Sequence, residues 1–168
     1  CEREPGEREL EDLLFGWLVE QGVSSNSVLF VRDGVTVSIG TGEQDRVGVT
    51  RSAIDKAYIK HTDAMCFKKY GKSIFQIELE IRRGERPAEQ LQELTERTRE
   101  EKAGLKDAVM ISDAFFPFRD AVDIAIAEGI TAIVHPGGSI RDFDSIEACN
   151  EADPKVAMVF TGQRAFKH

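Results

Sequence analysis

The spacing of hydrophobic side chains predicts how the start of the chain folds. Between residues 9 and 21 they recur every three or four positions, which predicts an amphipathic helix; they are Leu10, Leu13, Leu14, Trp17 and Leu18. Two strand-like runs follow at residues 27–32 and 35–39, and the dipeptide Asp33-Gly34 between them favours a tight turn. The pattern therefore predicts a helix followed by a β-hairpin.

The middle of the chain is dominated by charged residues. Residues 40–46, GTGEQDR, predict a flexible loop, and a helical pattern runs over residues 50–61. Residues 77–81, IELEI, alternate between apolar and charged side chains, which predicts a short strand. Residues 87–103 begin with proline and are rich in Glu, Gln, Arg and Leu, which predicts a solvated helix.

The last third of the chain alternates between buried-strand runs and helical segments. The runs are residues 108–112, 130–134 and 156–160, and this order predicts β-α-β-α-β with parallel strands. Ligands of open α/β sheets bind beyond the carboxyl ends of the strands. The segments that leave those ends are therefore expected to share one rim: residues 112–120, 135–142 and 161–168, together with the loop 40–46.

Composition excludes several classes of protein. The 168 residues are 41% hydrophobic and 31% charged, as in globular domains, and a chain of this size buries roughly 70% of its extended surface. A net charge of −8 argues against nucleic acid as the main partner. Three scattered cysteines predict neither a disulfide framework nor a zinc site, and favour a reducing, cytoplasmic setting.

The chain also lacks the sequence marks of membrane insertion or secretion. No apolar run reaches the ~18 to 20 residues that span a bilayer, and the first twelve residues are too charged for a secretory signal. We therefore expect no membrane partner. The chain opens on Cys1, which suggests a segment cut from a longer polypeptide.

Three motifs on the expected rim carry candidate chemistry. The PGGS motif, residues 136–139, is either an anion site made of free backbone amides or an ordinary glycine-rich turn. Aromatic side chains of this kind are usually core, yet Phe115, Phe116 and Phe118 also suit a wall for a flat heterocycle beside the Asp120 carboxylate. Arg46 and Arg164 each follow a strand and together suit a phosphate or carboxylate.

The histidines offer no recognisable catalytic arrangement. Lys60-His61 falls in or just after a helix, far from the rim segments, and is expected to be structural. His135 precedes PGGS and is better placed, although a histidine at a strand end is usually structural, and His168 is the last residue. The sequence contains no HExxH motif, no Ser-His-Asp order and no paired carboxylate motif.

Four segments together resemble the C-terminal part of the AICAR transformylase/IMP cyclohydrolase family of purine synthesis. They are SNSVLFVRDGVTVSIGTGEQDR, SDAFFPFRD, TAIVHPGGSIRD and VAMVFTGQRAFKH, of which SDAFFPF and the final RxFxH are the most specific. The resemblance implies a cytidine-deaminase-like three-layer α/β sandwich without zinc, whose mixed sheet joins an N-terminal hairpin to a C-terminal parallel β-α-β-α-β. It also implies a homodimer that transfers a formyl group from 10-formyltetrahydrofolate to AICAR at sites built on the subunit interface.

The resemblance assigns roles to individual positions. It implies contacts to the AICAR nucleotide for Asn26, Arg46 and Arg164. It implies the folate side of the site for Val47, Phe115, Asp120, Ser139 and Ile140. PGGS stands where zinc deaminases carry P-C-x-x-C, so no metal is expected.

The chain departs from the family in two ways. Asp45 replaces the usual Ser before Arg46, with Glu43 as a second nearby negative charge. The KHVNP-type motif that carries the catalytic Lys-His pair is absent, and Lys60-His61 does not inherit that role. We therefore expect no catalytic residue in this chain and no activity from the chain alone.

The resulting interpretation treats residues 1–168 as the C-terminal half of a transformylase domain, with an opening helix over residues 1–22 and a variable, mostly helical insertion over 51–107. Its expected partners are AICAR, folate, and either a second copy or the missing N-terminal half. The alternative is a non-catalytic nucleotide- or folate-binding module, or an assembly half of a split enzyme. A relic of a zinc deaminase is a third interpretation.

Overall fold

A mixed five-stranded sheet lies at the centre of the molecule. The computed structural model describes residues 1–167, and its strand order is β2-β1-β3-β4-β5. The strands are β1 (Val28–Arg32), β2 (Val35–Gly40), β3 (Val109–Ser112), β4 (Ala132–His135) and β5 (Ala157–Phe160). β1 runs antiparallel to β2 and β3, whereas β3, β4 and β5 are mutually parallel. The predicted hairpin and the predicted β-α-β-α-β are both confirmed.

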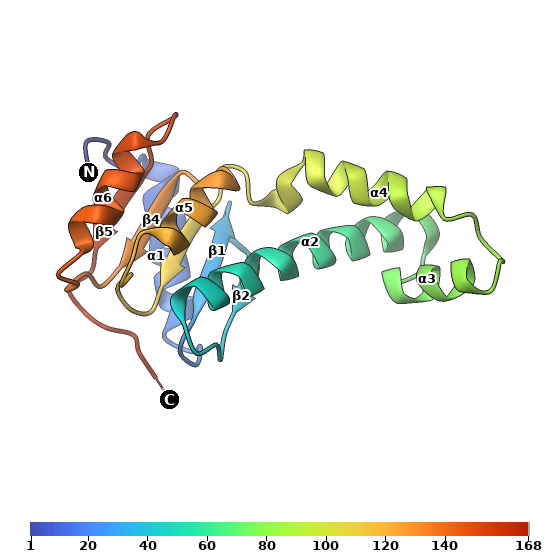
Figure 1. Cartoon of the computed structure of the whole chain (residues 1–168), viewed down its shortest axis with the longest axis horizontal. Coiled ribbons are helices and arrows are strands. Elements are labelled where there is room, and N and C mark those ends of the chain that lie inside the picture. The colour runs from blue at the N-terminus through green and yellow to red at the C-terminus, as the bar shows by residue number, and fades with distance from the viewer. Residues whose placement is uncertain (168) are drawn as a thin grey trace.

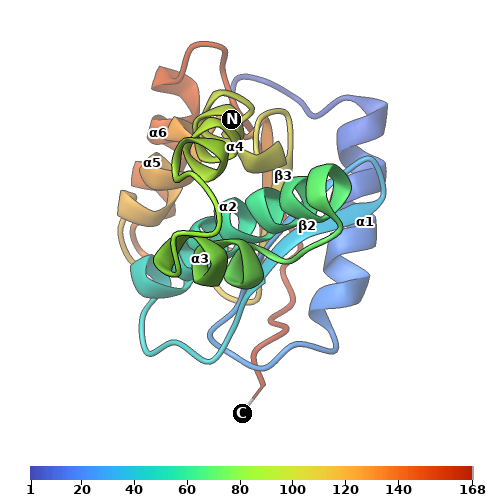
Figure 2. The ribbon, with the colours of Figure 1, turned by 90° about the vertical axis from the view of Figure 1, so that its right-hand side faces the viewer.

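Helices cover both faces of this sheet and make three layers (Figure 1, Figure 2). One face is covered by α1, and the other by α2, α5 and α6. The helical segments are α1 (Glu7–Glu20), α2 (Arg46–Tyr70), α3 (Ile74–Arg82), α4 (Glu89–Glu100), the short 3-10 turn η1 (Lys102–Gly104), α5 (Asp120–Ala127) and α6 (Asp142–Glu151). The observed class is thus α/β with a mixed sheet.

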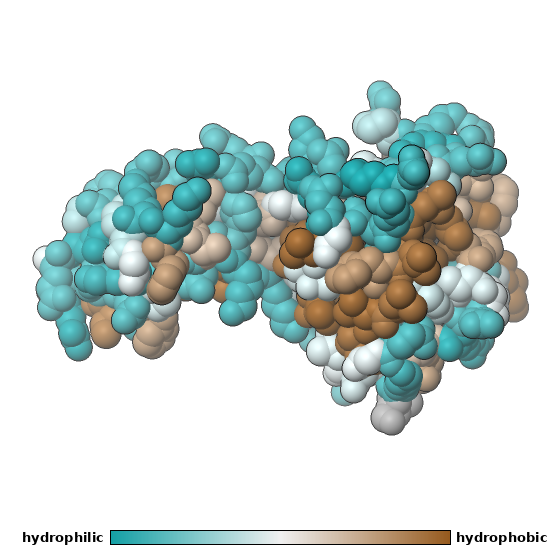
Figure 3. Space-filling model, turned by 180° about the vertical axis from the view of Figure 1, so that it is seen from behind, coloured by the Kyte–Doolittle hydropathy of each residue, from teal (hydrophilic) through white to brown (hydrophobic). Residues whose placement is uncertain are grey.

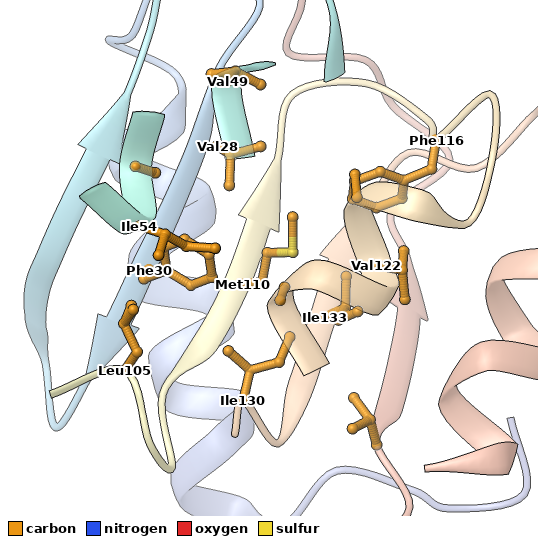
Figure 4. Packing of buried hydrophobic residues seen from close by; sticks show 14 of the residues in the cluster. Val28, Phe30, Val49, Ile54, Leu105, Met110, Phe116, Val122, Ile130 and Ile133 are labelled. Carbon is orange, nitrogen blue, oxygen red and sulfur yellow. The ribbon is translucent and has the colours of Figure 1, made fainter. Parts of the chain in front are cut away.

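Alternate residues of the strands supply two separate cores. In β1, Val28 and Phe30 pack toward α2, while Leu29 and Val31 pack toward α1. Successive side chains of a strand point to opposite faces, so a fully apolar strand such as β1 fits the middle of a sheet that helices cover on both sides. Figure 4 shows the larger core on the α2 side, where Phe30 and Met110 meet residues from α2 and α5.

A helical arm projects from one end of the sandwich (Figure 1). It consists of the second half of α2 with α3 and α4, and it has its own small core of Cys66, Ile77 and Leu94. Gly71 ends α2 in the left-handed conformation at φ +65°, where glycine carries no steric penalty. Residues 51–107 are mostly helical, as expected.

Two predicted elements of the middle region were wrong. Residues 77–81 belong to α3 and not to a strand, because Ile74, Ile77 and Ile81 also fit a helical stripe and the side chain of Ser73 caps the helix at Gln76. Helix α2 begins at Arg46 and not at residue 50, since the Asp45 carboxylate accepts the Gly48 N–H at 2.7 Å. Arg46 therefore lies on a helix and not on a flexible loop.

The apolar stripe expected in the first helix is divided between two faces. Leu13 and Trp17 pack on the sheet, but Leu10, Leu14 and Leu18 are exposed on the opposite side of α1. Gly16 allows this close packing, because a Cβ at that position would overlap the side chain of Ile111 in β3.

The carboxyl ends of four strands meet at one rim, as predicted. Gly40 of β2 and Ser112 of β3 both pair with Val28 of β1, so β2 and β3 end at the same edge of the sheet, on either side of β1. The ends of β4 and β5 follow in parallel register. The segments that leave these four ends are therefore neighbours in space.

Candidate functional site

A cavity of about 360 Å³ lies at this rim. Four segments line it: the segment that leads into β1, the loop after β2 with the start of α2, the loop after β3 and the tail after β5. Its lining residues are Asn26, Gln44, Asp45, Arg46, Ala114, Phe115, Pro117, Arg164 and Phe166. The three residues to which the resemblance assigns the nucleotide thus line one cavity, together with Phe115 from the folate set.

A buried ion pair lies beneath the cavity. The Arg46 guanidinium is 8% exposed and donates from Nη1 to Asp113 Oδ1 at 2.5 Å and to the Ser27 carbonyl at 3.0 Å. Asp113 is fully buried, and it also accepts the Ser25 hydroxyl and the Ser27 N–H. One carboxylate therefore holds donors from the start of β1 and from the start of α2.

Only the second amino group of Arg46 is directed toward Asn26. Arg46 Nη2 donates to Asn26 Oδ1 at 3.2 Å, while Asn26 Nδ2 donates to the Glu43 carbonyl at 2.8 Å. Asp113 therefore balances the charge of Arg46 without any ligand. On this side of the cavity a ligand meets hydrogen-bonding groups with little net charge.

Glu20 is a second buried carboxyl next to this pair. It accepts the Ser27 hydroxyl at one oxygen, and its other oxygen, Oε2, has no hydrogen-bond partner among residues 1–167. Burial, together with the negative charge of Asp113, raises the pKa of the Glu20 carboxyl to about 7, although the Ser27 hydrogen bond and the positive charge of Arg46 oppose the rise. Two buried carboxyls share one buried guanidinium, so keeping a proton on Glu20 removes an uncompensated charge.

The tail after β5 brings Arg164 to the cavity. The Ala165 N–H donates to the Asp113 carbonyl at 3.1 Å, and residues 25 and 167 exchange hydrogen bonds of 2.8 and 2.7 Å. Arg164 is exposed and lies over the Phe115 ring, 5.2 Å from its centre. His168, the last residue of the RxFxH motif, lies outside the described residues.

The PGGS motif does not offer the free amides that one interpretation required. The Gly137 N–H donates to His135 Nδ1 at 3.1 Å, and the N–H groups of Gly138 and Ser139 donate to Asp142 Oδ2 at 2.7 and 3.1 Å. The protein's own carboxylate occupies the place of an anion, so the glycine-rich turn is the correct interpretation. Helix α6 also begins only at Asp142, three residues beyond the motif.

The three aromatic residues after β3 take three different positions. Phe116 is fully buried in the larger core and packs edge-on against His135. Phe115 is half-buried at the cavity, and Phe118 is exposed with the Arg141 guanidinium over its ring. Only Phe115 is placed to form a wall of the cavity.

The two histidines within residues 1–167, His61 and His135, do not line the cavity. His135 is fully buried, and burial lowers its pKa to about 4, so the ring is neutral at physiological pH. Its Nδ1 accepts the Gly137 N–H, and its Nε2 lies 3.3 Å from the sulfur of Met158. His61 lies on the arm, between the Thr98 hydroxyl and the Glu101 carboxylate. Both positions agree with the structural roles expected of them.

The remaining folate positions lie outside the cavity. Val47 is half-buried on α2 and packs against the larger core, while Asp120 is exposed at the start of α5. The Ser139 hydroxyl accepts the Arg141 N–H at 3.1 Å, and Ile140 is fully exposed. Within residues 1–167 these four residues do not line the cavity that holds Phe115.

The other cavities and side-chain clusters within residues 1–167 show no metal site. Three larger cavities are present: two on the arm, of about 690 and 500 Å³, are lined by charged and apolar residues together, and one of about 440 Å³ lies between the hairpin turn and α2. Residues 1–167 contain no group of three or more His, Cys, Asp or Glu side chains arranged to hold a metal ion. No helix in this part of the chain combines the length and hydrophobicity needed to cross a membrane.

Sequence reasoning missed Asp113 and Glu20. Asp113 stands in the SDAFFPF segment, and an acidic residue at the end of a buried strand is a signal that a buried cation must face it. No local pattern marks Glu20, because it occupies one of several polar positions of α1. Their roles depend on contacts with residues that are distant in sequence.

Comparisons with known proteins place these features in context. Residues 1–56 match the model of a family described as "AICARFT/IMPCHase bienzyme". The chain is 40% identical over 166 residues to the bifunctional purine biosynthesis protein PurH of Aquifex aeolicus, and 39% identical over 167 residues to that of Clostridium perfringens. Each match covers 99% of this chain and 24% of the relative. The chain thus spans about a quarter of the length of these relatives.

Breaking the buried ion pair is expected to destabilise the fold. The change Asp113→Asn removes the negative charge that faces Arg46, and loss of one partner of a buried pair costs about 3 kcal/mol or more of unfolding free energy. Urea denaturation monitored by circular dichroism measures it. The control is Glu93→Gln, which breaks an exposed pair with Lys69 and should cost less than about 1 kcal/mol. Equal losses in the two variants would contradict the role given to Asp113.

Glu20 is expected to make stability depend on pH. Its pKa is about 7 in the folded chain against an ordinary value of 4.5, so folding favours the protonated form. This contribution is complete below pH 4.5 and is lost as the pH rises to about 7, a loss of at most about 3 kcal/mol. In Glu20→Gln this part of the pH dependence should disappear, as measured by urea unfolding at pH 5 and pH 8.5. Identical pH profiles for the two proteins would refute it.

Proposed function

We propose that this chain is the C-terminal part of an AICAR transformylase domain and serves purine biosynthesis. In this proposal it helps transfer a formyl group from 10-formyltetrahydrofolate to the 5-amino group of AICAR. The similarity to PurH proteins and the SDAFFPF motif support the proposal. The observation that carries it is that Asn26, Arg46 and Arg164, which come from three distant segments, line a single cavity.

The chemistry of the cavity suits an aromatic nucleotide. The half-buried ring of Phe115 provides a flat apolar surface, which favours stacking with a heterocycle. Arg164 is exposed beside it and is suited to a phosphate group, since a guanidinium donates to two phosphate oxygens at once. Asn26 and the Nη2 group of Arg46 are suited to the polar edge of the ligand.

We place the folate site on an exposed surface of this chain that another polypeptide would complete. Asp120 would accept N–H donors of the pterin ring, and Ile140 would contact its face, but both are exposed. A site with so little enclosure binds a flat ligand weakly, because most ligand pockets bury the greater part of the ligand surface. A second copy or the missing N-terminal half would close it.

The proposed reaction needs groups that this chain does not supply. The amine nitrogen of AICAR attacks the formyl carbon, a new C–N bond forms, and the bond to N10 of the folate breaks. The amine loses a proton and N10 gains one. The family's Lys-His pair would act as oxyanion stabiliser and base, so the chain alone is proposed to be inactive.

The finer description of the fold belongs to the same proposal. We assign the sandwich to the cytidine-deaminase-like arrangement without zinc. The turn after β4, where such deaminases place cysteine ligands, carries PGGS, whose amides are held by His135 and Asp142. Residues 51–107 would be the variable insertion of the domain, and the cytoplasm would be its location.

IMP cyclohydrolase activity is the competing function, since the matching family description names both activities. A non-catalytic assembly module is the other alternative. Conversion of formyl-AICAR to IMP by the chain alone, at a rate near that of a PurH relative, would overturn the transformylase assignment in favour of the cyclohydrolase.

Calorimetric titration of the folded chain with AICAR tests the proposal. We expect saturable binding that weakens at least tenfold in Arg164→Ala, because one bidentate phosphate contact is worth more than about 1.4 kcal/mol. The control is Arg82→Ala, an equally exposed arginine on the arm, which should bind like the wild type. No saturable binding, or an equal effect of the two changes, would refute the nucleotide site.

A parallel titration with a stable 10-formylfolate analogue tests the folate side. We expect binding that is weaker than in a PurH relative and that is lost in Asp120→Ala, because the carboxylate would accept the pterin donors. Asp123→Ala, an exposed carboxylate one turn further along α5, is the matched control. Binding that survives Asp120→Ala unchanged would remove Asp120 from the site.

A further inference from the structure

Helix α1 buries three carboxyl side chains beside Leu13 and Trp17, and its outer face is largely apolar. The side chains of Glu9, Asp12 and Glu20 are buried toward the rest of the chain. The outer face instead carries large apolar side chains with substantial exposure: Leu10 at 49%, Leu14 at 61%, Phe15 at 38% and Leu18 at 64%. A helix that covers a sheet normally shows the opposite distribution.

The inner carboxylates have partners that fix the rotation of α1. Glu9 accepts the Gly6 N–H at 2.7 Å and pairs with Arg3 at 2.7 Å. Asp12 accepts the N–H groups of Asp33 and Gly34, the two residues of the hairpin turn, at 2.9 and 2.7 Å. Rotating α1 to bury its exposed leucines would break the contacts of Asp12 with the hairpin turn.

Close packing on the sheet gives the same orientation. Gly16 lies against Ile111 of β3, and any larger residue at this position of the helix would overlap that side chain. Turning another side of α1 toward the sheet would place a leucine or phenylalanine where only a glycine fits. The contacts of Asp12 and Gly16 therefore hold the outer residues away from the sheet in this structure.

The outer residues form one continuous stripe. Leu10, Leu14 and Leu18 recur every four positions, and Phe15 lies beside them. Figure 3 shows the molecule from the side on which α1 lies, and a broad hydrophobic area covers the body there. Continuous apolar patches on soluble proteins mark surfaces that another macromolecule covers.

We propose that this stripe, Leu10, Leu14, Phe15 and Leu18, docks the part of a PurH-type polypeptide that lies outside this chain. The inference rests on the proposed function and names the surface through which the two parts associate. The matched relatives are about four times as long as the match, so a large additional polypeptide is available in each of them to cover the stripe.

Charge favours this occupant over a second copy. Glu7 and Glu11 are exposed at one end of the stripe, and the last turn of α1 contains no basic residue to complement them in a second copy. The chain as a whole carries a net charge of −8, so two copies repel each other. The docking surface is therefore expected to be apolar, with lysine or arginine residues opposite Glu7 and Glu11.

Sedimentation velocity of two polypeptides tests the proposal. One is this chain, and the other is Aquifex aeolicus PurH from which the matching quarter has been removed. We expect a 1:1 complex that becomes at least tenfold weaker in Leu14→Glu and in the milder Leu18→Gln. The control is Phe67→Glu on the arm, where the side chain is 66% exposed, and it should leave the complex unchanged. Circular dichroism shows whether each variant is folded.

Three results would overturn the proposal. These are no complex with the unaltered chain, a complex that both α1 variants retain, or self-association of the chain that Leu14→Glu abolishes, which would make a second copy the occupant. The measurement needs no substrate, so it is independent of the proposed function. A complex without formyl transfer would count against the transformylase alone, and AICAR binding without a complex would count against the docking surface alone.

Discussion

One buried carboxylate, that of Asp113, organises the rim of the sheet, because it must be paired with hydrogen-bond donors from several segments. Asp113 is fully buried at the end of β3, where an ionised group is stable only if it is paired and hydrogen-bonded. Its donors are the Ser25 hydroxyl, the Ser27 N–H and the Arg46 guanidinium, which belong to the start of β1 and the start of α2. The Asp113 carbonyl also accepts the Ala165 N–H. Satisfying one residue therefore fixes three segments around one cavity.

The same arrangement determines which charge a ligand meets. Asp113 neutralises the charge of Arg46. The guanidinium can therefore orient a ligand through a hydrogen bond, but it adds little net charge to attract one. Arg164 is the exposed cation of the cavity, and it is held by a tail whose own position depends on Asp113 and Ser25. In a chain of net charge −8, the overall field does not attract an anion, so the proposed anionic ligand would depend on these local groups. The proposed ligand, a flat ring that carries a phosphate, fits this arrangement.

The sequence predicted those parts of the fold that depend on local periodicity. The hairpin, the parallel strands and the shared rim follow from strand length and turn residues, and they are correct. The segment 77–81 was misassigned because its residues fit both periods and only contacts with α2 and α4 decide between them. Arg46 and Asp113 are 67 positions apart, so no local pattern predicts their pairing. Of the two interpretations of PGGS, the anion site fails because the Asp142 carboxylate accepts the N–H groups of Gly138 and Ser139.

The first helix shows why a correct period does not determine which face is buried. Burying three leucines against the sheet would contribute about 2 kcal/mol each, whereas burying carboxylates is costly without partners. The observed orientation is nevertheless consistent, because Asp12 holds the hairpin turn and Gly16 alone allows close contact with β3. The inner face of α1 carries the carboxyl groups that contact the hairpin turn and Ser27 at the rim. The outer face carries the leucines that suit contact with another apolar surface. A helix with two such faces is fully buried only when something outside this chain covers the second one.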